Sequence, residues 1–510
     1  MVSRKPWISV ESPGYKWAVS AAVMFGTLIV VLNSTGVNIA LPWMMAEFKA
    51  TPDQIQWVVT AYTLSMAVLM PTLGRFSDLL GYKRLFIVCL LLFSLSSGLC
   101  AIAWDIYSLI AFRALQGLGA GIIMPLAMAV LFEVFPAEKR GFAMGVYGLG
   151  VSLGPVMGPI LAGYLTEYLS WQAVFYSNIP LSLLSALGIA WMMPEVGQRK
   201  AFSLDGWGLM TLTAFLTSLL LALSQGGRWG WTSPAIGSLL AIAVLSLALF
   251  LWVELRSRQP LVDLSLYRDT NFLVGSLIGG FFGLSLMSSI FLISLFVQNV
   301  LGYTPSEAGH VMAPGALIMG VIMLLSGKIS DRIDPKPPIV IGLLLLAANS
   351  YWMSLVNLHT SFMTILLMIV FRHFSLAVVW SPLMAISMQT LTRERMGMGT
   401  GLLNVVRQGL GGSIGVALAA VFLVSRQQTH ILTRLSETHA PPLSAQALSS
   451  LIDHLGKNGH GAQAAGVHAL TSVPSEALQQ ATVLAYQDCF IAITWLALLA
   501  ITPILMLRRK

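Results

Sequence analysis

Three arginines and one histidine lie inside long apolar segments of this 510-residue sequence. Arg113, Arg372 and Arg407 each follow an apolar residue, and His373 follows Arg372 directly. A charged side chain inside a membrane is costly, so such residues are expected to have a function. We expect Arg113 to act in gating or proton coupling, with a structural bond to backbone carbonyls as the alternative. Arg372, His373 and Arg407 are expected to line a substrate cavity.

Acidic side chains are missing from the centres of the same segments. The nearest ones, Glu133, Glu167 and Asp488, lie toward segment ends. A cavity that contains arginines but no central carboxylate disfavours a cation, because nothing offsets the cost of removing its water. Neutral or anionic amphiphiles therefore fit better. Proton coupling would then use an acid at a segment end, a charge cluster at Asp78, or His373.

The composition requires a membrane around these residues. Apolar residues make up 56% of the chain and charged residues only 10%, whereas soluble proteins carry about 25% charged residues. Runs such as 85–103 and 236–253 approach the ~20 residues that cross a bilayer as a helix. The short alternating strands of a membrane barrel are not seen. The predicted fold class is an all-α integral membrane protein.

Fourteen membrane-spanning helices are predicted from the apolar runs, the first of them read as a retained helix and not a signal peptide. Their ranges are 17–42, 55–74, 85–103, 106–130, 142–165, 173–193, 207–224, 235–253, 272–297, 308–326, 338–357, 362–390, 398–424 and 482–507.

The positive charges predict the orientation of these helices. Of the 29 Lys and Arg residues, 21 lie in the termini and the even-numbered loops, and only five lie in the opposite loops. Because positive loops stay in the cytoplasm, both termini are expected there, in a multi-pass protein of the cell (inner) membrane. The net charge of +8 follows from this asymmetry, so it does not indicate nucleic acid as a partner.

The sequence also repeats itself. A shift of 253 residues aligns Gly74 and Asp78 with Gly327 and Asp331, and a shift of 259 aligns Arg113 with Arg372. Both copies run in the same direction, which is a known transporter arrangement with the substrate site between the halves. We expect an N-terminal six-helix bundle over 1–195, a linker with two extra helices over 196–270, and a C-terminal six-helix bundle over 271–510. An external loop is expected at 425–481, with a short helix near 443–455.

The loop after the second predicted helix carries a recognisable pattern, GRFSDLLGYKR over 74–84. Gly74 permits close helix approach and Gly81 permits a turn that a side chain would hinder. Asp78, with Lys83 and Arg84 nearby, can form a charge cluster that locks one conformation. This pattern resembles the loop signature of the major facilitator superfamily.

Three further segments resemble signatures of the same family. Residues 113–121 (RALQGLGAG) are similar to its second signature, which has an intramembrane arginine. Residues 150–159 (GVSLGPVMGP) resemble the antiporter signature, in which Gly150, Gly154 and Gly158 form a stripe that permits tight, slidable contact and Pro155 bends the helix. Residues 404–415 resemble a pattern in the fourteen-helix drug:proton antiporters. The resemblance covers essentially the whole chain.

The first predicted helix departs from that subfamily. Residues 32–42 (LNSTGVNIALP) resemble its first-helix signature, which normally has Asp at the position of Asn33. Asn cannot titrate, so this position cannot carry a proton. For the substrate cavity we select polar, aromatic and methionine residues from several predicted helices: Asn33, Asn38, Trp57, Tyr62, Gln116, Phe281, Phe282, Met287, Gln298, Arg372, His373, Asn404, Arg407 and Gln408.

The resemblance implies an exporter of hydrophobic or amphiphilic drug-like compounds that works by alternating access, with protons as the exchanged ion. A periplasmic adaptor protein is a further expected partner. The alternative is an exporter or facilitator of a lipid-like or anionic metabolite without standard proton coupling, which Asn33 supports. No zinc motif, nucleophile elbow or phosphate-binding glycine loop occurs, so no enzyme, ATP-driven pump, cofactor or metal is expected.

Overall fold

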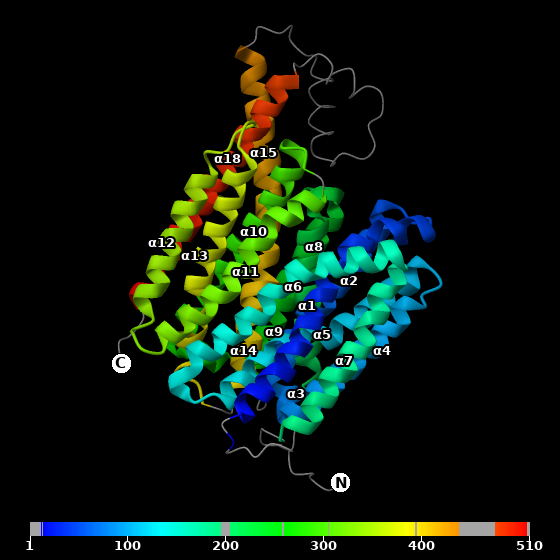
Figure 1. Cartoon of the computed structure of the whole chain (residues 1–510), viewed down its shortest axis with the longest axis vertical. Coiled ribbons are helices and arrows are strands. Elements are labelled where there is room, and N and C mark those ends of the chain that lie inside the picture. The colour runs from blue at the N-terminus through cyan, green and yellow to red at the C-terminus, as the bar shows by residue number, and fades with distance from the viewer. Residues whose placement is uncertain are drawn as a thin grey trace.

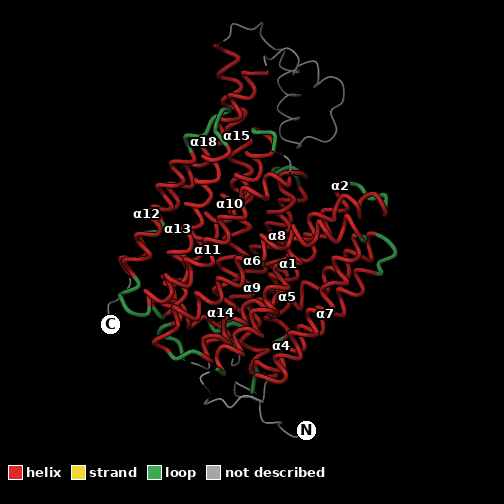
Figure 2. Tube along the Cα trace, viewed as in Figure 1, coloured by secondary structure: helices red, strands yellow, loops and turns green. Residues whose placement is uncertain are grey.

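The computed structural model describes residues 12, 14–194, 205–257, 260–303, 305–392, 395–437 and 475–506. Every regular element in these residues is helical, as Figure 2 shows. The longer helices are α1 (Tyr15–Glu47), α2 (Pro52–Leu69), α3 (Leu73–Leu80), α4 (Tyr82–Ala101), α5 (Ile106–Val134), α6 (Arg140–Tyr168), α7 (Trp171–Met192), α8 (Gly206–Trp229), α9 (Pro234–Arg256), α10 (Thr270–Leu295), α11 (Pro305–Ser330), α12 (Lys336–Met353), α13 (Phe362–Met388), α14 (Met396–Asn404), α15 (Ser413–Glu437) and α18 (Ser475–Leu499).

Short helical turns connect or interrupt the longer helices. They are η1 (Met70–Thr72), η2 (Ala137–Lys139), η3 (Leu264–Arg268), the π-helical η4 (Phe296–Val300) and η6 (Val405–Gly412), and η7 (Thr502–Met506). Each of the fourteen predicted segments overlaps at least one of the longer helices, and the segment 398–424 is divided between α14, η6 and α15. The predicted segment 55–74 is nevertheless interrupted by η1 at Pro71, because proline lacks the N–H that continues an α-helix.

Local sequence signals explain several helix boundaries. The side chain of Thr51 caps α2 and that of Asp105 caps α5, each in a reciprocal arrangement with the residue three positions later. Between α3 and α4 the chain turns at Gly81, whose φ of 76° lies in the region that favours glycine. The predicted requirement for glycine at this turn is therefore confirmed.

The expected loop 425–481 is partly wrong. α15 continues to Glu437 and α18 already begins at Ser475, so both helices extend beyond their apolar spans. Asp488 of α18 explains this extension, because it accepts hydrogen bonds from Arg426 at 2.6 Å and His430 at 2.8 Å, both on α15. The expected short helix near 443–455 lies outside the described residues.

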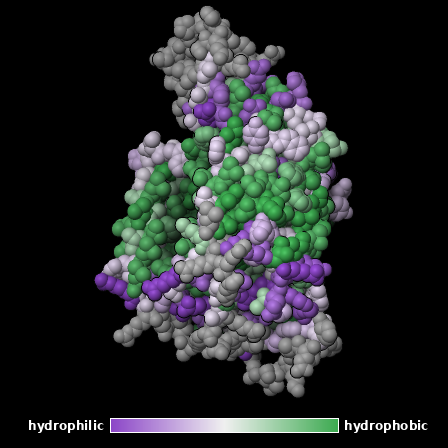
Figure 3. Space-filling model, turned by 90° about the vertical axis from the view of Figure 1, so that its left-hand side faces the viewer, coloured by the Kyte–Doolittle hydropathy of each residue, from purple (hydrophilic) through white to green (hydrophobic). Residues whose placement is uncertain are grey.

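The helices form a membrane-embedded bundle. Thirteen spans in the described residues are long and apolar enough to cross a membrane. The predicted segment that these thirteen spans leave out is 338–357, which corresponds to α12, and its Lys-Pro-Pro start and Asn-Ser sequence near its end make it less apolar. A hydrophobic belt runs around the visible face, with hydrophilic residues gathered at the lower end (Figure 3). Apolar side chains such as Val244 and Leu245 of α9 are largely exposed, as expected for contact with lipid.

Two groups of helices lie on opposite sides of the molecule in Figure 1. α1 to α7 form the N-terminal group, and α10 to α18 form the C-terminal group. α8 and α9 pack against each other, and α8 contacts both α2 and α15. The start of α1 and the short helix η7 lie at the same lower end of the bundle, which we call the terminal end (Figure 1). This end also holds α3 and the beginning of α14.

Candidate functional site

A buried polar network joins four helices of the N-terminal group around Asn33 of α1. The Asn33 side-chain amide donates to Gln116 Oε1 of α5 at 3.3 Å, and its oxygen accepts from Asn178 of α7 at 3.0 Å. Asn33 is only 2% exposed. An ionised aspartate could accept the bond from Asn178 but could not donate to Gln116. The network therefore uses both the hydrogen-bond donor and the acceptor of the Asn33 side-chain amide.

Arg113 of α5 lies in the same network. Its Nη1 donates to Gln116 Oε1 at 2.6 Å and its Nε donates to the Val58 carbonyl of α2 at 3.1 Å. The guanidinium carbon is 4.1 Å from the centroid of the Tyr62 ring, which adds a cation–π contact. Neutral acceptors and an aromatic face thus stabilise this buried charge.

Ser97 of α4 completes the network, and sequence analysis missed it together with Asn178. Ser97 Oγ accepts from Gln116 at 3.0 Å and from Asn178 at 3.1 Å, and it donates to the Phe175 carbonyl at 3.0 Å. A single Ser or Asn in an apolar helix is common, so residue type gave little signal. Only the convergence of α1, α4, α5 and α7 reveals their role.

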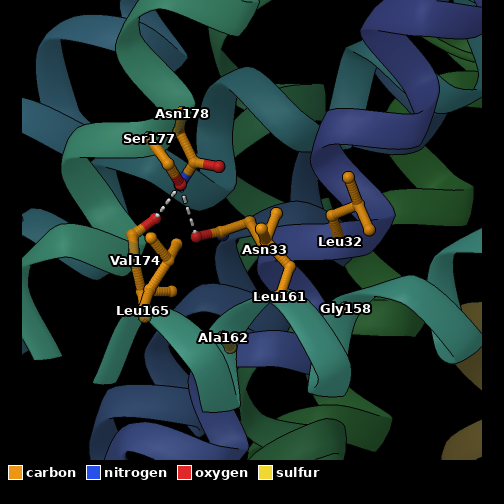
Figure 4. Close-up of a pocket in the computed structure, with 9 residues that line it drawn as sticks. All are labelled: Leu32, Asn33, Gly158, Leu161, Ala162, Leu165, Val174, Ser177 and Asn178. Atoms are coloured by element: carbon orange, nitrogen blue, oxygen red, sulfur yellow. Dashed lines mark hydrogen bonds between the residues drawn. The ribbon is translucent and has the colours of Figure 1, made fainter. Parts of the chain in front are cut away.

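A small pocket lies beside the network, between α1, α6 and α7 (Figure 4). Asn33 and Asn178 supply its polar wall, and the close-up shows the bond between them. The remaining lining is mostly apolar and includes Leu32, Leu161 and Leu165. The pocket has room for about one water molecule. A drug-sized compound needs a cavity of roughly 300–1,000 Å³, so this pocket does not hold one in the observed conformation.

The C-terminal group has its own buried arginine cluster. Arg407 of η6 donates to Asn404 Oδ1 at 2.7 Å, and its guanidinium carbon lies 4.0 Å from the Trp380 ring centroid. Tyr147 of α6, which belongs to the N-terminal group, is fully buried and lies close enough to interact electrostatically with Arg407. This cluster therefore spans the boundary between the two groups.

Arg372 of α13 differs from its repeat partner Arg113. It is 1% exposed, and its Nε and Nη1 have no hydrogen-bond partner among the described residues. Its Nη2 lies 3.4 Å from His373 Nε2, and the other ring nitrogen of His373 lies 2.8 Å from the Ile369 carbonyl oxygen. A buried guanidinium with two unpaired donors is costly, so Arg372 is equipped to meet an acceptor that is absent here.

The other selected cavity residues vary in exposure. Phe282 is buried and packs against Trp380, with ring centroids 5.6 Å apart. Half-buried positions are occupied by Trp57, Phe281, Met287 and Gln408, whereas Asn38 and Gln298 are exposed. The Asn38 amide donates to the Ser34 carbonyl at 3.5 Å, and the Gln298 amide donates to the Ser294 carbonyl at 3.1 Å. Within the described residues, neither amide bonds a member of the two buried clusters.

The glycines of the antiporter-like segment pack within the N-terminal group. A side-chain carbon on Gly150, Gly154 or Gly158 would overlap α1 at Met24, Val31 or Thr35, respectively. The Thr35 hydroxyl donates to the Gly154 carbonyl at 3.2 Å. Pro155 is exposed on α6, which continues past it. This stripe permits the tight contact that was predicted, and the contact is between α6 and α1.

Close contacts join the two groups at the terminal end, and those between α6 and α11 continue into the bundle as far as Gly320, where a side-chain carbon would lie 2.5 Å from Ser152 Oγ. A side-chain carbon on Gly74 of α3 would lie 2.7 Å from Met398 of α14, and one on Gly401 would lie 2.6 Å from the Met70 carbonyl oxygen. Across the molecule, a side-chain carbon on Gly141 of α6 would lie 2.6 Å from the Gly327 carbonyl oxygen of α11. The repeated loops thus form equivalent backbone contacts, which close this end.

Asp331 strengthens one of these contacts. It follows α11, and its two oxygens accept hydrogen bonds from the Gly141 and Phe142 backbone N–H groups at 2.7 and 2.9 Å. It therefore caps α6 of the other group, where a negative charge is favoured. Burial raises the pKa of the Asp331 carboxyl, and these two hydrogen bonds oppose that shift.

The first copy of the loop makes different contacts. Asp78 Oδ2 lies 3.8 Å from Arg75 Nη1, and Arg75 Nε donates to the Pro260 carbonyl at 2.6 Å. Lys83 donates to the Ala190 carbonyl of α7 at 2.7 Å. Arg84 is exposed. Arg75 of this loop thus binds the segment that follows α9, which the sequence did not indicate. The cluster of Asp78 with Lys83 and Arg84 stays a prediction.

We expect Asp331→Ala to weaken closure of the terminal end. Loss of a helix-capping side chain costs ~1 kcal/mol, which shifts the closed-to-open ratio about fivefold. The measurement is the rate of maleimide modification of a Ser77→Cys reporter, since Ser77 is 5% exposed and lies beside α14 in the closed end. This rate is divided by that of an Ala137→Cys reporter on the exposed turn η2. Asp269→Ala is the control, since Asp269 also accepts two backbone N–H bonds but caps α10 locally. Equal modification in both alanine variants would contradict the role given to Asp331.

Comparisons with known proteins give the family context of this geometry. The model of the Major Facilitator Superfamily matches residues 23–416. The multidrug transporter protein MdtP of Bacillus subtilis is 30% identical over 82% of this chain and 77% of its own length. The multidrug export protein EmrB of Haemophilus influenzae is 30% identical over 82% of both chains. The human organic anion transporter MFSD10 has a similar fold, with a TM-score of 0.60 and 17% identity over 97% of this chain and all of its own.

Proposed function

Because this chain belongs to the major facilitator superfamily, we propose that it exports hydrophobic or amphiphilic drug-like compounds by alternating access. Membership makes it a multi-pass membrane transporter of small molecules and not an enzyme. Relatives named as multidrug transporters support the substrate class. The carrying observation is that close glycine contacts join the two groups at the terminal end, and that those between α6 and α11 continue from there to Ser152 and Gly320. Separation of these contacts is the movement that alternating access needs.

The charge asymmetry supports a cell (inner) membrane location with both termini in the cytoplasm. In that orientation the terminal end is the cytoplasmic end, and the observed conformation is closed toward the cytoplasm. We take α1–α7 and α10–α18 as the two moving bundles of six spans each, with α8 and α9 as the inserted pair. A periplasmic adaptor protein that extends the export route belongs to the same proposal.

The two buried arginine clusters are the proposed substrate-facing machinery. Arg113 and its amide partners fix the relative positions of α1, α4, α5 and α7, so the N-terminal group moves as one body. Arg407 faces Tyr147 across the boundary between the groups, so its surroundings change when the groups separate. The partly exposed aromatic and methionine residues supply an adaptable apolar wall.

The first test of export is a drug-susceptibility panel on cells with and without the protein. Cells that produce it should survive higher concentrations of several lipophilic compounds, and Gly141→Val, which blocks the terminal contact, should remove that protection at equal protein level. An identical panel in both strains would reject the substrate class.

Proton antiport is the proposed energy source, although the first helix supplies no titratable group. Asn33 is fully engaged as an amide, so a proton must bind elsewhere. We expect Asn33→Asp to add a charge that offsets the desolvation of cations. Transport of a cationic dye should rise about tenfold relative to a neutral one, which corresponds to ~1.4 kcal/mol of added charge interaction.

The control for this substitution is Asn38→Asp, which adds the same charge at an exposed position of the same helix. Dye transport would be measured in vesicles over a range of pH. If Asn33→Asp leaves both the substrate range and the pH dependence unchanged, the importance given to Asn33 is wrong.

A second candidate function is export or facilitated movement of a lipid-like or anionic compound without standard proton coupling. Arg372 favours it, because two of its buried donors have no partner in the described residues. An anionic headgroup would satisfy them with charge-assisted hydrogen bonds. Under this function Arg372→Gln should reduce transport of anionic compounds and spare neutral ones.

A further inference from the structure

We propose that Glu254 and Asp205 together form a proton-binding site in the inserted helix pair, where one shared proton stabilises the closed terminal end. Glu254 lies in the last turn of α9, and Asp205 caps the start of α8. The proposal deepens the proposed function, because it supplies the proton site that Asn33 cannot provide. Neither residue belongs to the signature segments or to the two arginine clusters.

The geometry shows two carboxylates that each have one satisfied and one unsatisfied oxygen. Glu254 Oε2 accepts from the Val262 backbone N–H at 3.2 Å, and Asp205 Oδ1 accepts from the Gly208 backbone N–H at 2.9 Å. The remaining oxygens, Glu254 Oε1 and Asp205 Oδ2, are buried without a hydrogen-bond partner in the described residues. Glu254 is 4% exposed, so water does not compensate for the missing bond.

The two unsatisfied oxygens face the same small space. A side-chain carbon placed on Gly208 would lie 2.8 Å from Glu254 Oε1 and 3.1 Å from Asp205 Oδ2. Two carboxylates whose buried oxygens share a site cannot both carry a negative charge at low cost. A proton held by one carboxyl group can be donated to the other, which satisfies both oxygens.

Charged and hydrogen-bonding groups of two neighbouring elements, α3 and the segment after α9, interact with the pair. From α3, the Arg75 guanidinium interacts electrostatically with Glu254, but it also donates to the Pro260 carbonyl and lies 3.8 Å from Asp78. From the segment after α9, the Val262 N–H is the direct donor. The next charged residue of that segment, Asp263, is 3.6 Å from Arg395. Arg75, the cation of the described residues that interacts with Glu254, thus has other acceptors as well.

The same segment connects the pair to both helix groups. Its Pro260 carbonyl binds Arg75 of the N-terminal group, while Asp263 pairs with Arg395 and its backbone N–H lies 2.9 Å from the Met398 sulfur at the start of α14. Met398 is also the residue that Gly74 approaches. Residues 260–263 therefore bridge the closed end, and Glu254 holds this bridge through Val262.

The consequence is a link between protonation and opening. While the bridge is in place, Glu254 remains buried and shares a proton with Asp205. When the groups separate and the bridge leaves Val262, Glu254 reaches water, ionises and releases that proton at the terminal end. Loss of the proton in the closed state places two negative charges side by side, which favours opening. With the termini in the cytoplasm, release occurs on the side that antiport requires.

The test measures opening without any substrate, so that it does not depend on export. The protein in lipid nanodiscs carries the Ser77→Cys reporter, and its maleimide modification is normalised to the exposed Ala137→Cys reporter at each pH. The native cysteines in the described residues are buried. Between pH 6 and pH 9 we expect the normalised rate to rise about tenfold. This factor corresponds to a proton affinity that differs by about one pKa unit between the closed and the open conformation. Glu254→Gln should remove this rise and keep the rate low.

Two further variants separate the proposal from loss of folding. Asp205→Asn still caps α8, because Asn is an equally good capping residue, but it removes the like charge. The rise should therefore move to lower pH. Glu138→Gln, on the exposed turn η2, should leave the profile unchanged.

Some results of the reporter experiment would contradict the proposed proton site. A parent profile that is flat with pH, or a rise that persists in Glu254→Gln, would exclude the pair. A rise that disappears in Asp331→Asn and not in Glu254→Gln would assign the proton to Asp331. Failure of drug export with a normal reporter profile would reject the proposed function and leave the proton site standing.

Discussion

Gly327→Ala should largely abolish transport, although it adds only one methyl group. The new carbon would overlap the Gly141 carbonyl oxygen of α6 and the backbone at Phe142. Backbone atoms cannot move away as a flexible side chain can, so α6 and α11 must separate. Overpacking of this kind costs ~1–3 kcal/mol, which moves the closed-to-open ratio by about 5- to 150-fold. Transport in vesicles should fall by a comparable factor, and the Ser77→Cys reporter should become accessible.

The matched control is Gly163→Ala on α6. A side-chain carbon there meets nothing within 4 Å, and the substitution has the same intrinsic effect on helix stability. It should leave transport and reporter accessibility unchanged. If Gly327→Ala transports as well as Gly163→Ala, the backbone contact at the terminal end does not control closure.

Arg113→Lys should have the second largest effect. Arginine bonds Gln116 and the Val58 carbonyl simultaneously and also lies over the Tyr62 ring. A lysine has one compact ammonium group and cannot reproduce that planar arrangement. Each lost charge-assisted hydrogen bond costs ~1.5–3 kcal/mol. We expect a clear fall in the thermal midpoint of the detergent-purified protein and a transport rate reduced about 100-fold or more.

The repeat supplies the control for this substitution. Arg372 occupies the corresponding position, but its Nε and Nη1 have no hydrogen-bond partner in the described residues. Arg372→Lys therefore loses few hydrogen bonds, and its thermal midpoint should stay near that of the parent. Equal destabilisation by the two lysine variants would show that the N-terminal network does not hold Arg113 as described.

The sequence was sufficient for the positions of the helices, because length, apolar runs and capping residues are local properties. Gly81 was expected to permit a turn, and the structure has that turn. Thr51 and Asp105, which were not used in the prediction, cap the starts of α2 and α5. The extension of α15 to Glu437 was missed, because it depends on Asp488, more than fifty residues away. The π-helical turn at η6 also has no local signal of its own in the apolar run.

The candidate site was predictable only in part. Arg113, Gln116 and Asn33 stood out as polar residues in signature segments, but the bonds that join them to Ser97 and Asn178 come from the packing of four helices. The repeat correctly paired Asp78 with Asp331 by position. It did not predict that Asp331 would cap α6 while the Asp78 loop would bind residues after α9. The inserted helices α8 and α9 break the symmetry at the Asp78 loop. An alignment of one half with the other leaves these two helices out.

The difference between the two loops also explains why Glu254 was overlooked. It lies at the end of an apolar helix, where acidic residues are ordinary. Its importance depends on Asp205 and Val262, which fold back against it. An acid at a helix end was expected as a proton carrier, but Glu133, Glu167 and Asp488 were the expected candidates and Glu254 was not among them.

Transport by the purified protein in sealed proteoliposomes with an imposed pH gradient tests the central claim most directly. The protein would be oriented with its terminal end outward, and a lipophilic fluorescent compound would be supplied outside. Proton antiport predicts that the compound accumulates inside against its own gradient when the interior is acidic, and that accumulation stops when a protonophore removes the gradient. Movement that only equalises the compound and is indifferent to the pH gradient would contradict proton-driven export.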